Sequence, residues 1–438
     1  MLIRRFLHYI DALPQRWYVV CLMLLFLGVS IQYTDKALEN RSAFLRWRDQ
    51  IQQLEAENIY ERYLYPNPPI MGLMLRPLTE LPPVAGALVW FYLKVGMTLL
   101  TFWMVFRIVE SAGRTIPVWA KLLTIALSIR PIIGDLTHGN VNLLILFLVV
   151  ASLYAFTRGR DWLAGAAMAL AIACKVTPLL FVPYFLWKRA WKALAGCAVG
   201  LVLFFWIVPG MFLDNNNELL ASWFEQMVKP FVVSGKVFYS EHNNQSLPGL
   251  TTRLLTDSPS FSTYINDIYT PTDYHNLLSL SEATARWLVK GCMGIFALLI
   301  VWSCRTARDH APGWRLLAEF SLIALGMLLF SERTWKHHCV LLLLPFATLC
   351  YYLAVCRPRR PLRYHLIGSL LLVTFLMAST SSGLLGKPFA KLAQVYGAYV
   401  WAFLLLSAAL VTILRAPINR TPSARIQAPE PDALSQAA

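Results

Sequence analysis

The stretch DWLAGAAMALAIACKVTPLLFVPYFLWKR, residues 161–189, decides the fold. It is long and apolar enough to cross a membrane, but Lys175 and Pro178 interrupt its middle. Basic residues flank both of its ends: Arg158, Arg160, Lys188, Arg189 and Lys192. Since short cytoplasmic loops are enriched in Lys and Arg, both ends are predicted to face the cytoplasm. We therefore predict two short helices, 162–174 and 177–187, with Lys175 at the turn on the other side of the membrane.

The rest of the chain repeats this pattern of apolar runs separated by basic turns. Hydrophobic residues make up 57% of the 438 residues and charged residues 14%, against about 25% charged residues in soluble proteins. The apolar runs cover about 17–34, 84–106, 115–131, 141–157, 162–187, 191–212, 286–303, 316–330, 339–355, 364–384 and 393–414. Counting the interrupted run as two, the sequence predicts an all-α polytopic integral membrane protein with a bundle of about 11–12 transmembrane helices.

The formal net charge of +15 is concentrated in the turns between these runs. We interpret this charge as a topology signal that places both termini in the cytoplasm, and nucleic acid is not predicted as a partner. The eight cysteines lie in or beside apolar runs and predict neither a disulfide framework nor a zinc site.

The sequence predicts one transmembrane domain over residues 1–415 and a disordered cytoplasmic tail over 416–438. Two long segments, about 34–81 and 212–285, are predicted on the non-cytoplasmic side, where loops of this length are usually functional. In the first, apolar residues recur with helical spacing, which predicts an amphipathic helix suited to the membrane interface. These residues are Phe44, Trp47, Ile51 and Leu54.

Four stretches place unusual polar residues at the same non-cytoplasmic ends of the predicted helices. These residues are His138, Asn140 and Asn142 in HGNVN, Lys175 in CKVTP, Asn244, Gln245 and Ser246 in NNQS, and His337 and His338 in ERTWKHH. Polar groups at such positions are candidates for a functional site, and the Lys175 ammonium is suited to a phosphate. Each also has a simpler explanation: a snorkelling lysine, helix caps at the asparagines, and interface packing of the histidines.

The order and spacing of these stretches resemble glycosyltransferase family 87. The segments that carry the resemblance are YPNPPIMGLMLRPLTELPP (65–83), RPIIGDLTHGNVNLLIL (130–146), the stretch around Lys175, NNQSLPGLTTRLL (243–255) and SERTWKHHCVLLLLP (331–345). The resemblance implies a GT-C membrane enzyme, similar to polyprenyl-phosphate-mannose-dependent α-mannosyltransferases. It implies transfer of a hexose from a polyprenyl-phosphate donor to a lipid or glycan acceptor on the non-cytoplasmic face. Mannose is the hexose that we expect.

The resemblance also suggests roles for individual residues. It implies that Lys175 and one of His337 and His338 contact the donor phosphate. Polar residues that it places around the substrate are His138, Asn140, Asn142, Asn244, Gln245 and Ser246. Arg46 is a further predicted phosphate contact.

The sequence departs from the family in its first outer segment. The family generally has an Asp-Phe pair there, whereas RSAFLRW has Ala43 before Phe44. A base is wanted because the acceptor hydroxyl loses a proton as it attacks the sugar. Asp35, Glu39 and Asp49 are the alternative candidates.

Other functions remain open at this point. A transporter or flippase of an anionic lipid or glycolipid would use the same cations at a broken helix. An intramembrane prenyltransferase would need paired aspartate-rich motifs, of which NDIYTPTD (266–273) is one near-match. No cofactor or metal is required by the sequence, and we expect a bacterial inner membrane with the active face periplasmic or extracellular.

Overall fold

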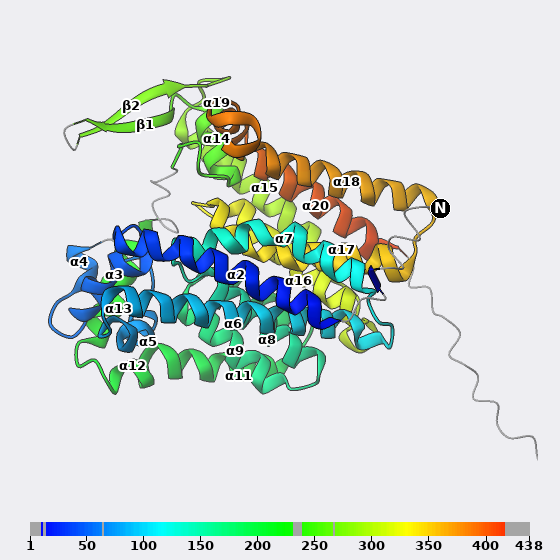
Figure 1. Ribbon diagram of the computed structural model, residues 1–438, viewed down its shortest axis with the longest axis horizontal. Coiled ribbons are helices and arrows are strands. Elements are labelled where there is room, and N and C mark those ends of the chain that lie inside the picture. The colour runs from blue at the N-terminus through cyan, green and yellow to red at the C-terminus, as the bar shows by residue number, and fades with distance from the viewer. Residues whose placement is uncertain (1–9, 12–14, 64, 231–238, 266–267, 417–438) are drawn as a thin grey trace, which may run out of the picture.

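A computed structural model describes residues 10–11, 15–63, 65–230, 239–265 and 268–416 of the chain. Long helices lie side by side in an elongated bundle, and short elements gather at one end, on the left in Figure 1. The predicted all-α polytopic membrane protein is confirmed. The predicted tail over 416–438 lies outside the described residues apart from its first position.

The first half of the chain alternates long helices with short connecting ones. Its elements are α2 (Gln15–Leu38), α3 (Ala43–Gln52), α4 (Ile59–Arg62), α5 (Pro69–Thr79), α6 (Pro83–Val109), η1 (Glu110–Ala112), α7 (Val118–His138), α8 (Asn142–Thr157), α9 (Asp161–Cys174), η2 (Thr177–Phe181), α10 (Val182–Trp187), α11 (Trp191–Val202), η3 (Leu203–Ile207) and α12 (Val208–Gly210).

The second half begins with the second long outer segment and returns to long helices. Its elements are α13 (Asn216–Trp223), η4 (Phe224–Val228), α14 (Leu247–Leu255), β1 (Pro259–Ile265), β2 (Ile268–Tyr274), α15 (Glu282–Ser303), η6 (Arg308–His310), α16 (Gly313–Phe330), η7 (Lys336–Leu342), α17 (Leu343–Tyr351), η8 (Tyr352–Cys356), α18 (Arg360–Ser379), α19 (Ser382–Val395) and α20 (Ala398–Arg415). The two strands pair antiparallel, from Pro259 opposite Tyr274 to Ile265 opposite Ile268.

Eight helical stretches among the described residues are long and apolar enough to cross a membrane. They are 16–38, 83–109, 191–210, 282–303, 313–330, 336–356, 360–379 and 398–415. Two further predicted runs, 141–157 and the interrupted 162–187, form three shorter apolar helices, 142–157, 161–174 and 177–187, and the run 115–131 lies mainly in α7. Every predicted apolar run therefore forms helix.

The interrupted segment folds as its sequence predicts. Helix α9 ends at Cys174, and Lys175 follows in an extended conformation with φ −161° and ψ 121°. The chain then continues through η2 into α10, which ends before Lys188. The break matters because it places the partly buried Lys175 side chain between two short helices instead of within one long helix.

Helix α16 lies at the centre of the bundle. The rest of the protein buries 94% of the apolar stretch of α16 but only 17% of that of α15. Helix α15 is therefore expected to face lipid. The end of α16 at Phe330 leads directly into the segment 331–335, which also belongs to the candidate site described below.

Helices α9 and α11 approach each other closely through glycines, as small residues allow in membrane helices. A Cβ on Gly196 would lie 2.6 Å from the carbonyl oxygen of Trp162, and a Cβ on Gly200 would lie 2.6 Å from Cβ of Ala169. At Gly165 a Cβ would overlap the backbone of Ala193. This contact fixes α9, and with it the position of Lys175 at its end.

Gly165→Val is therefore expected to destabilise the protein by about 1–3 kcal/mol, because overpacking a backbone contact forces the two helices apart. The measurement is the thermal unfolding midpoint in detergent. Gly291→Val is the matched control, since Gly291 lies on α15 with open space where its Cβ would be. Equal unfolding midpoints for the two variants would contradict the close packing of α9 and α11.

Helix α3 contains the predicted amphipathic segment, but its apolar face does not meet lipid. Phe44 and Ile51 are fully buried, as is Leu54 just beyond the helix, and Trp47 is 8% exposed. A Cβ on Gly72 of α5 would lie 3.3 Å from Leu54 Cδ2. Protein packing, including contact with α5, therefore covers this apolar face, while the predicted place of α3 in the membrane interface stays a prediction.

Candidate functional site

A cavity of about 80 Å³ lies where the start of α8, the break after α9, the end of α16 and η7 meet. Its lining residues are Asn142, Ile145, Lys175, Thr177, Met327, Leu328, Ser331, Arg333, Thr334, His338, Val340 and Leu341. Three of the predicted site residues, Asn142, Lys175 and His338, are thus brought together from distant parts of the sequence. Arg333 adds a second cation to the same wall.

A chain of hydrogen bonds orients Lys175. Its Nζ donates to Asn142 Oδ1 (2.7 Å), and Asn142 Nδ2 donates to Asp135 Oδ1 (2.9 Å). The other carboxylate oxygen of Asp135 accepts from the backbone N–H of Leu143 (3.4 Å). Asn142 is the first residue of α8, but its side chain does not cap the helix; it bonds Asp135 and Lys175 instead.

Asp135 is paired with Lys94 of α6, and both side chains are fully buried. Lys94 Nζ donates to the backbone oxygen of Asp135 (2.9 Å) and lies 3.4 Å from Asp135 Oδ2. The sequence analysis missed both residues. An ionisable residue inside the apolar run 84–106 was the available signal for Lys94, because such residues are expensive in a membrane unless they have a partner.

The histidines of HGNVN and KHH pack against one another beside the cavity. The ring centroids of His138 and His337 are 4.1 Å apart, and Asn140 Nδ2 lies 3.4 Å from His337 Nε2. His337 and His338 are nearly perpendicular, with an interplanar angle of 83°. Of the two adjacent histidines, His338 therefore lines the cavity while His337 packs against His138.

Gly139 makes this arrangement possible at the end of α7. It adopts φ +75°, the left-handed conformation that ends a helix, and a Cβ there would lie 2.9 Å from Tyr33 Oη. The same Cβ would lie 3.3 Å from the backbone nitrogen of Phe44. The start of α3 is therefore close to the HGNVN turn. Ala43, where the resemblance leads us to expect an aspartate, is 1% exposed at this junction.

Asn244, Gln245 and Ser246 are fully buried and do not line the cavity. Asn244 Nδ2 donates to the backbone oxygen of Glu332 (2.8 Å), and its Oδ1 accepts from the backbone N–H of Thr334 (2.9 Å). The backbone N–H of Gln245 donates to the backbone oxygen of Thr334 (2.7 Å). Ser246 caps α14 through Gly249. These residues hold the segment 331–335, and so position Arg333 in the cavity wall.

Arg253 stabilises the same outer region, and the sequence analysis did not identify it. Its guanidinium is fully buried and donates only to backbone oxygens among the described residues: those of Val395, Ser240, Glu241, Asn244 and Gln394. Burial lowers the pKa of Arg253 to about 10, so the side chain remains charged at neutral pH. The outer loop, α14 and the end of α19 are therefore joined by one cation.

The carboxylates predicted as bases lie on the exposed surface. Asp49 is 79% exposed beside Arg48, and Glu39 is 56% exposed in an ion pair with Arg41. Asp35 is also exposed. None of the three lines the cavity. Arg46 is exposed as well and does not line the cavity.

Comparison with known sequences gives the family. The model of glycosyltransferase family 87 matches residues 63–332. The chain belongs to this family. The matched region contains Asn142, Lys175 and the Asn244 group, and it ends just before Arg333.

Several proteins similar to this family 87 chain have assigned names. A polyprenol-phosphate-mannose-dependent alpha-(1-2)-phosphatidylinositol mannoside mannosyltransferase of Mycobacterium tuberculosis is 29% identical over 154 residues, which are 32% of this chain and 36% of that protein. A polyprenol-phosphate-mannose-dependent alpha-(1-2)-phosphatidylinositol pentamannoside mannosyltransferase of Mycolicibacterium smegmatis is 26% identical over 289 residues, 63% of this chain and 58% of that protein. The family 87 chain thus spans between about a third and three fifths of the length of these relatives.

One solved structure is weakly similar. The crystal structure of ArnT from Cupriavidus metallidurans, bound to undecaprenyl phosphate, has a TM-score of 0.40 and 14% sequence identity. The similarity covers 90% of this chain and 77% of that one.

Proposed function

We propose that this family 87 protein transfers a hexose, mannose in the first instance, from a polyprenyl-phosphate donor to a lipid or glycan acceptor. The observation that carries the proposal is the convergence of Lys175, Arg333 and His338 on one cavity at a helix break. Such a group of cationic and hydrogen-bonding side chains at the end of membrane helices suits a lipid phosphate. The named relatives, which are polyprenol-phosphate-mannose-dependent mannosyltransferases, support the donor class.

The cavity residues suit the leaving group of this reaction. When the acceptor oxygen attacks the anomeric carbon, the bond from that carbon to the phosphate oxygen breaks and negative charge grows on the lipid phosphate. Lys175 Nζ, fixed by Asn142, and the Arg333 guanidinium would stabilise that charge more strongly in the transition state than in the ground state. Arg333 is itself held over the ring of Tyr239, with its Cζ 3.4 Å from the ring centroid.

Glu332 is a further candidate for the base that accepts the proton of the acceptor hydroxyl. Glu332 does not itself line the cavity, but its neighbours Ser331 and Arg333 do, and its Oε1 is buried without a hydrogen-bond partner among the described residues. Burial raises the pKa of Glu332 to about 7, and the charge of Arg333 partly opposes that rise. A carboxyl group with this pKa can accept a proton at neutral pH.

Glu332→Gln is expected to lower transfer by about 10²-fold, the lower end of the usual range for general-base catalysis. In the wild type, activity should rise with pH through about 7, because the base must be ionised, and this rise should disappear in the variant. Alanine at Asp35, Glu39 or Asp49 should change transfer by less than about threefold, since those side chains face solvent. A large loss of transfer in any of these three variants, together with an active Glu332→Gln variant, would show that the base lies in the first outer segment.

The active face is proposed to be periplasmic or extracellular in a bacterial inner membrane, opposite the basic turns. The distribution of Lys and Arg supports this orientation. An acceptor of the lipid-linked or glycan class fits a site at a membrane surface, and the two named relatives act on phosphatidylinositol mannosides.

The test is sugar transfer by purified protein in nanodiscs, with radiolabelled polyprenyl-phosphate mannose and candidate membrane acceptors. Transfer from the lipid-linked donor and none from a nucleotide-linked mannose would support the proposal. Absence of both transfer and donor binding with mannose, glucose and arabinose donors would contradict it and favour the transport alternative.

A further inference from the structure

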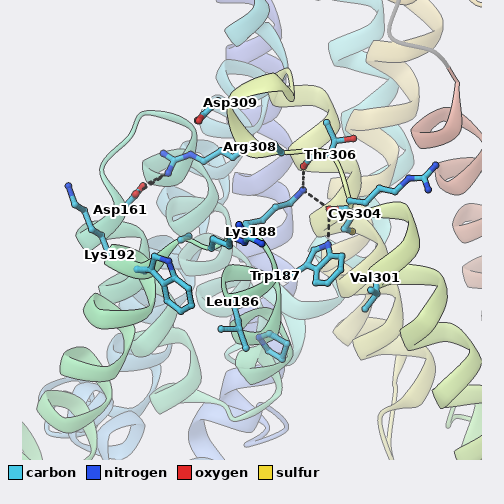
Figure 2. Close-up of a pocket in the computed structure, with 16 residues that line it drawn as sticks. Asp161, Leu186, Trp187, Lys188, Lys192, Val301, Cys304, Thr306, Arg308 and Asp309 are labelled. Carbon is cyan, nitrogen blue, oxygen red and sulfur yellow. Dashed lines mark hydrogen bonds and ion pairs between the residues drawn. The ribbon is translucent and has the colours of Figure 1, made fainter.

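A second and larger cavity lies at the opposite end of the bundle from the candidate site. Its volume is about 890 Å³, and it opens between the start of α9, the turn from α10 to α11 and the end of α15 (Figure 2). The residues around it come from the turns that are rich in Lys and Arg. We call it the basic-end cavity.

Two ion pairs hold the walls of the basic-end cavity in place. Lys188 Nζ donates to the backbone oxygens of Cys304 (2.7 Å) and Thr306 (2.6 Å) and pairs with the buried Glu319 (2.7 Å). Arg308 pairs with Asp161 at 2.8 Å, as Figure 2 shows. The turns of α10 and α15 are thereby tied together, so the cavity is preformed.

Three other cations at the cavity have no ion pair. Arg189, Lys192 and Arg305 are exposed and have no side-chain partner among the described residues. The one unpaired carboxylate that lines the cavity is Asp309. The lining therefore carries an excess of free positive charge, and an anion is the ligand that would neutralise it.

Aromatic and aliphatic side chains lie beside these cations. Trp187 is 50% exposed and Trp191 is 63% exposed, and exposed Trp is typical of the membrane–water interface. Leu186 (54% exposed) and Val301 (42% exposed) line the same cavity within the helices. A ligand that fits this lining combines an anionic head with an apolar chain.

We propose that the basic-end cavity binds an anionic phospholipid of the surrounding bilayer, whose head group is attracted by the unpaired cations Arg189, Lys192 and Arg305 in the cavity lining. Trp187 and Trp191 would lie at the level of its glycerol backbone, and an acyl chain would run along Leu186 and Val301. Basic pockets between membrane helices on the cytoplasmic side are typical sites for anionic lipid head groups. The proposal is independent of the transfer reaction, because none of these residues lines the candidate site.

The test is binding of short-chain phosphatidylglycerol and phosphatidylcholine to the delipidated full-length protein, measured by native mass spectrometry. The wild type is expected to bind phosphatidylglycerol at least about tenfold more tightly than phosphatidylcholine, since basic residues near a membrane surface attract anionic lipid head groups. Replacing Arg189, Lys192 and Arg305 together with alanine should remove this preference.

A matched control removes the same charge from outside the cavity. Arg158, Arg359 and Arg360 are exposed and do not line it, so their triple alanine variant should keep the preference. Equal binding of the two lipids by the wild type, or an unchanged preference in the cavity variant, would overturn the proposal. Inorganic phosphate is the third probe: tight binding of phosphate without binding of phosphatidylglycerol would assign the cavity to a soluble anion and overturn the lipid assignment.

Discussion

Lys175→Ala is expected to lower sugar transfer by about 10²–10³-fold while the protein remains folded. Removing one fixed donor from the charge that develops in a transition state has an effect of this size. The loss should appear mainly in kcat, because the growing charge on the leaving phosphate exceeds that of the bound donor. The measurement is initial rate against donor concentration for purified protein in nanodiscs.

Two further variants separate charge from fold. Lys175→Met keeps the length of the side chain without its charge and should show the same loss. Lys229→Ala removes an exposed lysine that pairs with Glu225 in the second outer segment, and should leave the rate within about twofold. Activity near that of the wild type in both Lys175 variants would exclude Lys175 from the phosphate site.

Asp135→Leu is expected to destabilise the protein by about 3–5 kcal/mol, because it leaves the fully buried Lys94 without its charge partner. The same change removes the carboxylate that holds Asn142 and, through it, Lys175. The thermal unfolding midpoint measures the first effect, and the transfer rate measures the second.

The double variant Lys94→Met with Asp135→Leu separates the two effects. Replacing both members of a buried ion pair by apolar residues is often neutral for stability, so the unfolding midpoint should recover. Transfer should stay low, since nothing then orients Asn142. Recovery of both stability and transfer would show that the pair serves the fold alone.

The helices were predictable because apolar length and basic turns are local signals. The break at Lys175 followed from a charge and a proline in the middle of one run, and the structure confirms it. The sequence predicted that Asn142, Lys175 and His338 lie on the same side of the membrane, but not that they line one cavity. The side of the membrane follows from the basic residues in the turns, whereas the 2.7 Å contact between Lys175 and Asn142 depends on how α8 and α9 pack.

The misplaced features all depend on long-range packing. The apolar face of α3 has the same spacing whether lipid or α5 covers it, and the sequence alone does not distinguish the two. Asn244 to Ser246 have the polarity of binding residues, but backbone groups from residues 332–334 and 394 use that polarity. Asp135 was overlooked because its partner Lys94 lies 41 residues away in a different helix.

The small size of the cavity at Lys175 has a consequence for turnover. At about 80 Å³ it is well below the roughly 300–1,000 Å³ of pockets that enclose small organic ligands, so a hexosyl phosphate does not fit in the described state. One wall consists of closely packed α8 and α9, while the other is the segment 331–335, held by hydrogen bonds from Asn244 and Gln245. We therefore expect donor binding to require movement of a cavity wall, and the segment 331–335 with the Asn244 loop bound to it is the wall that we expect to move. Opening of this segment could then limit the rate of each catalytic cycle.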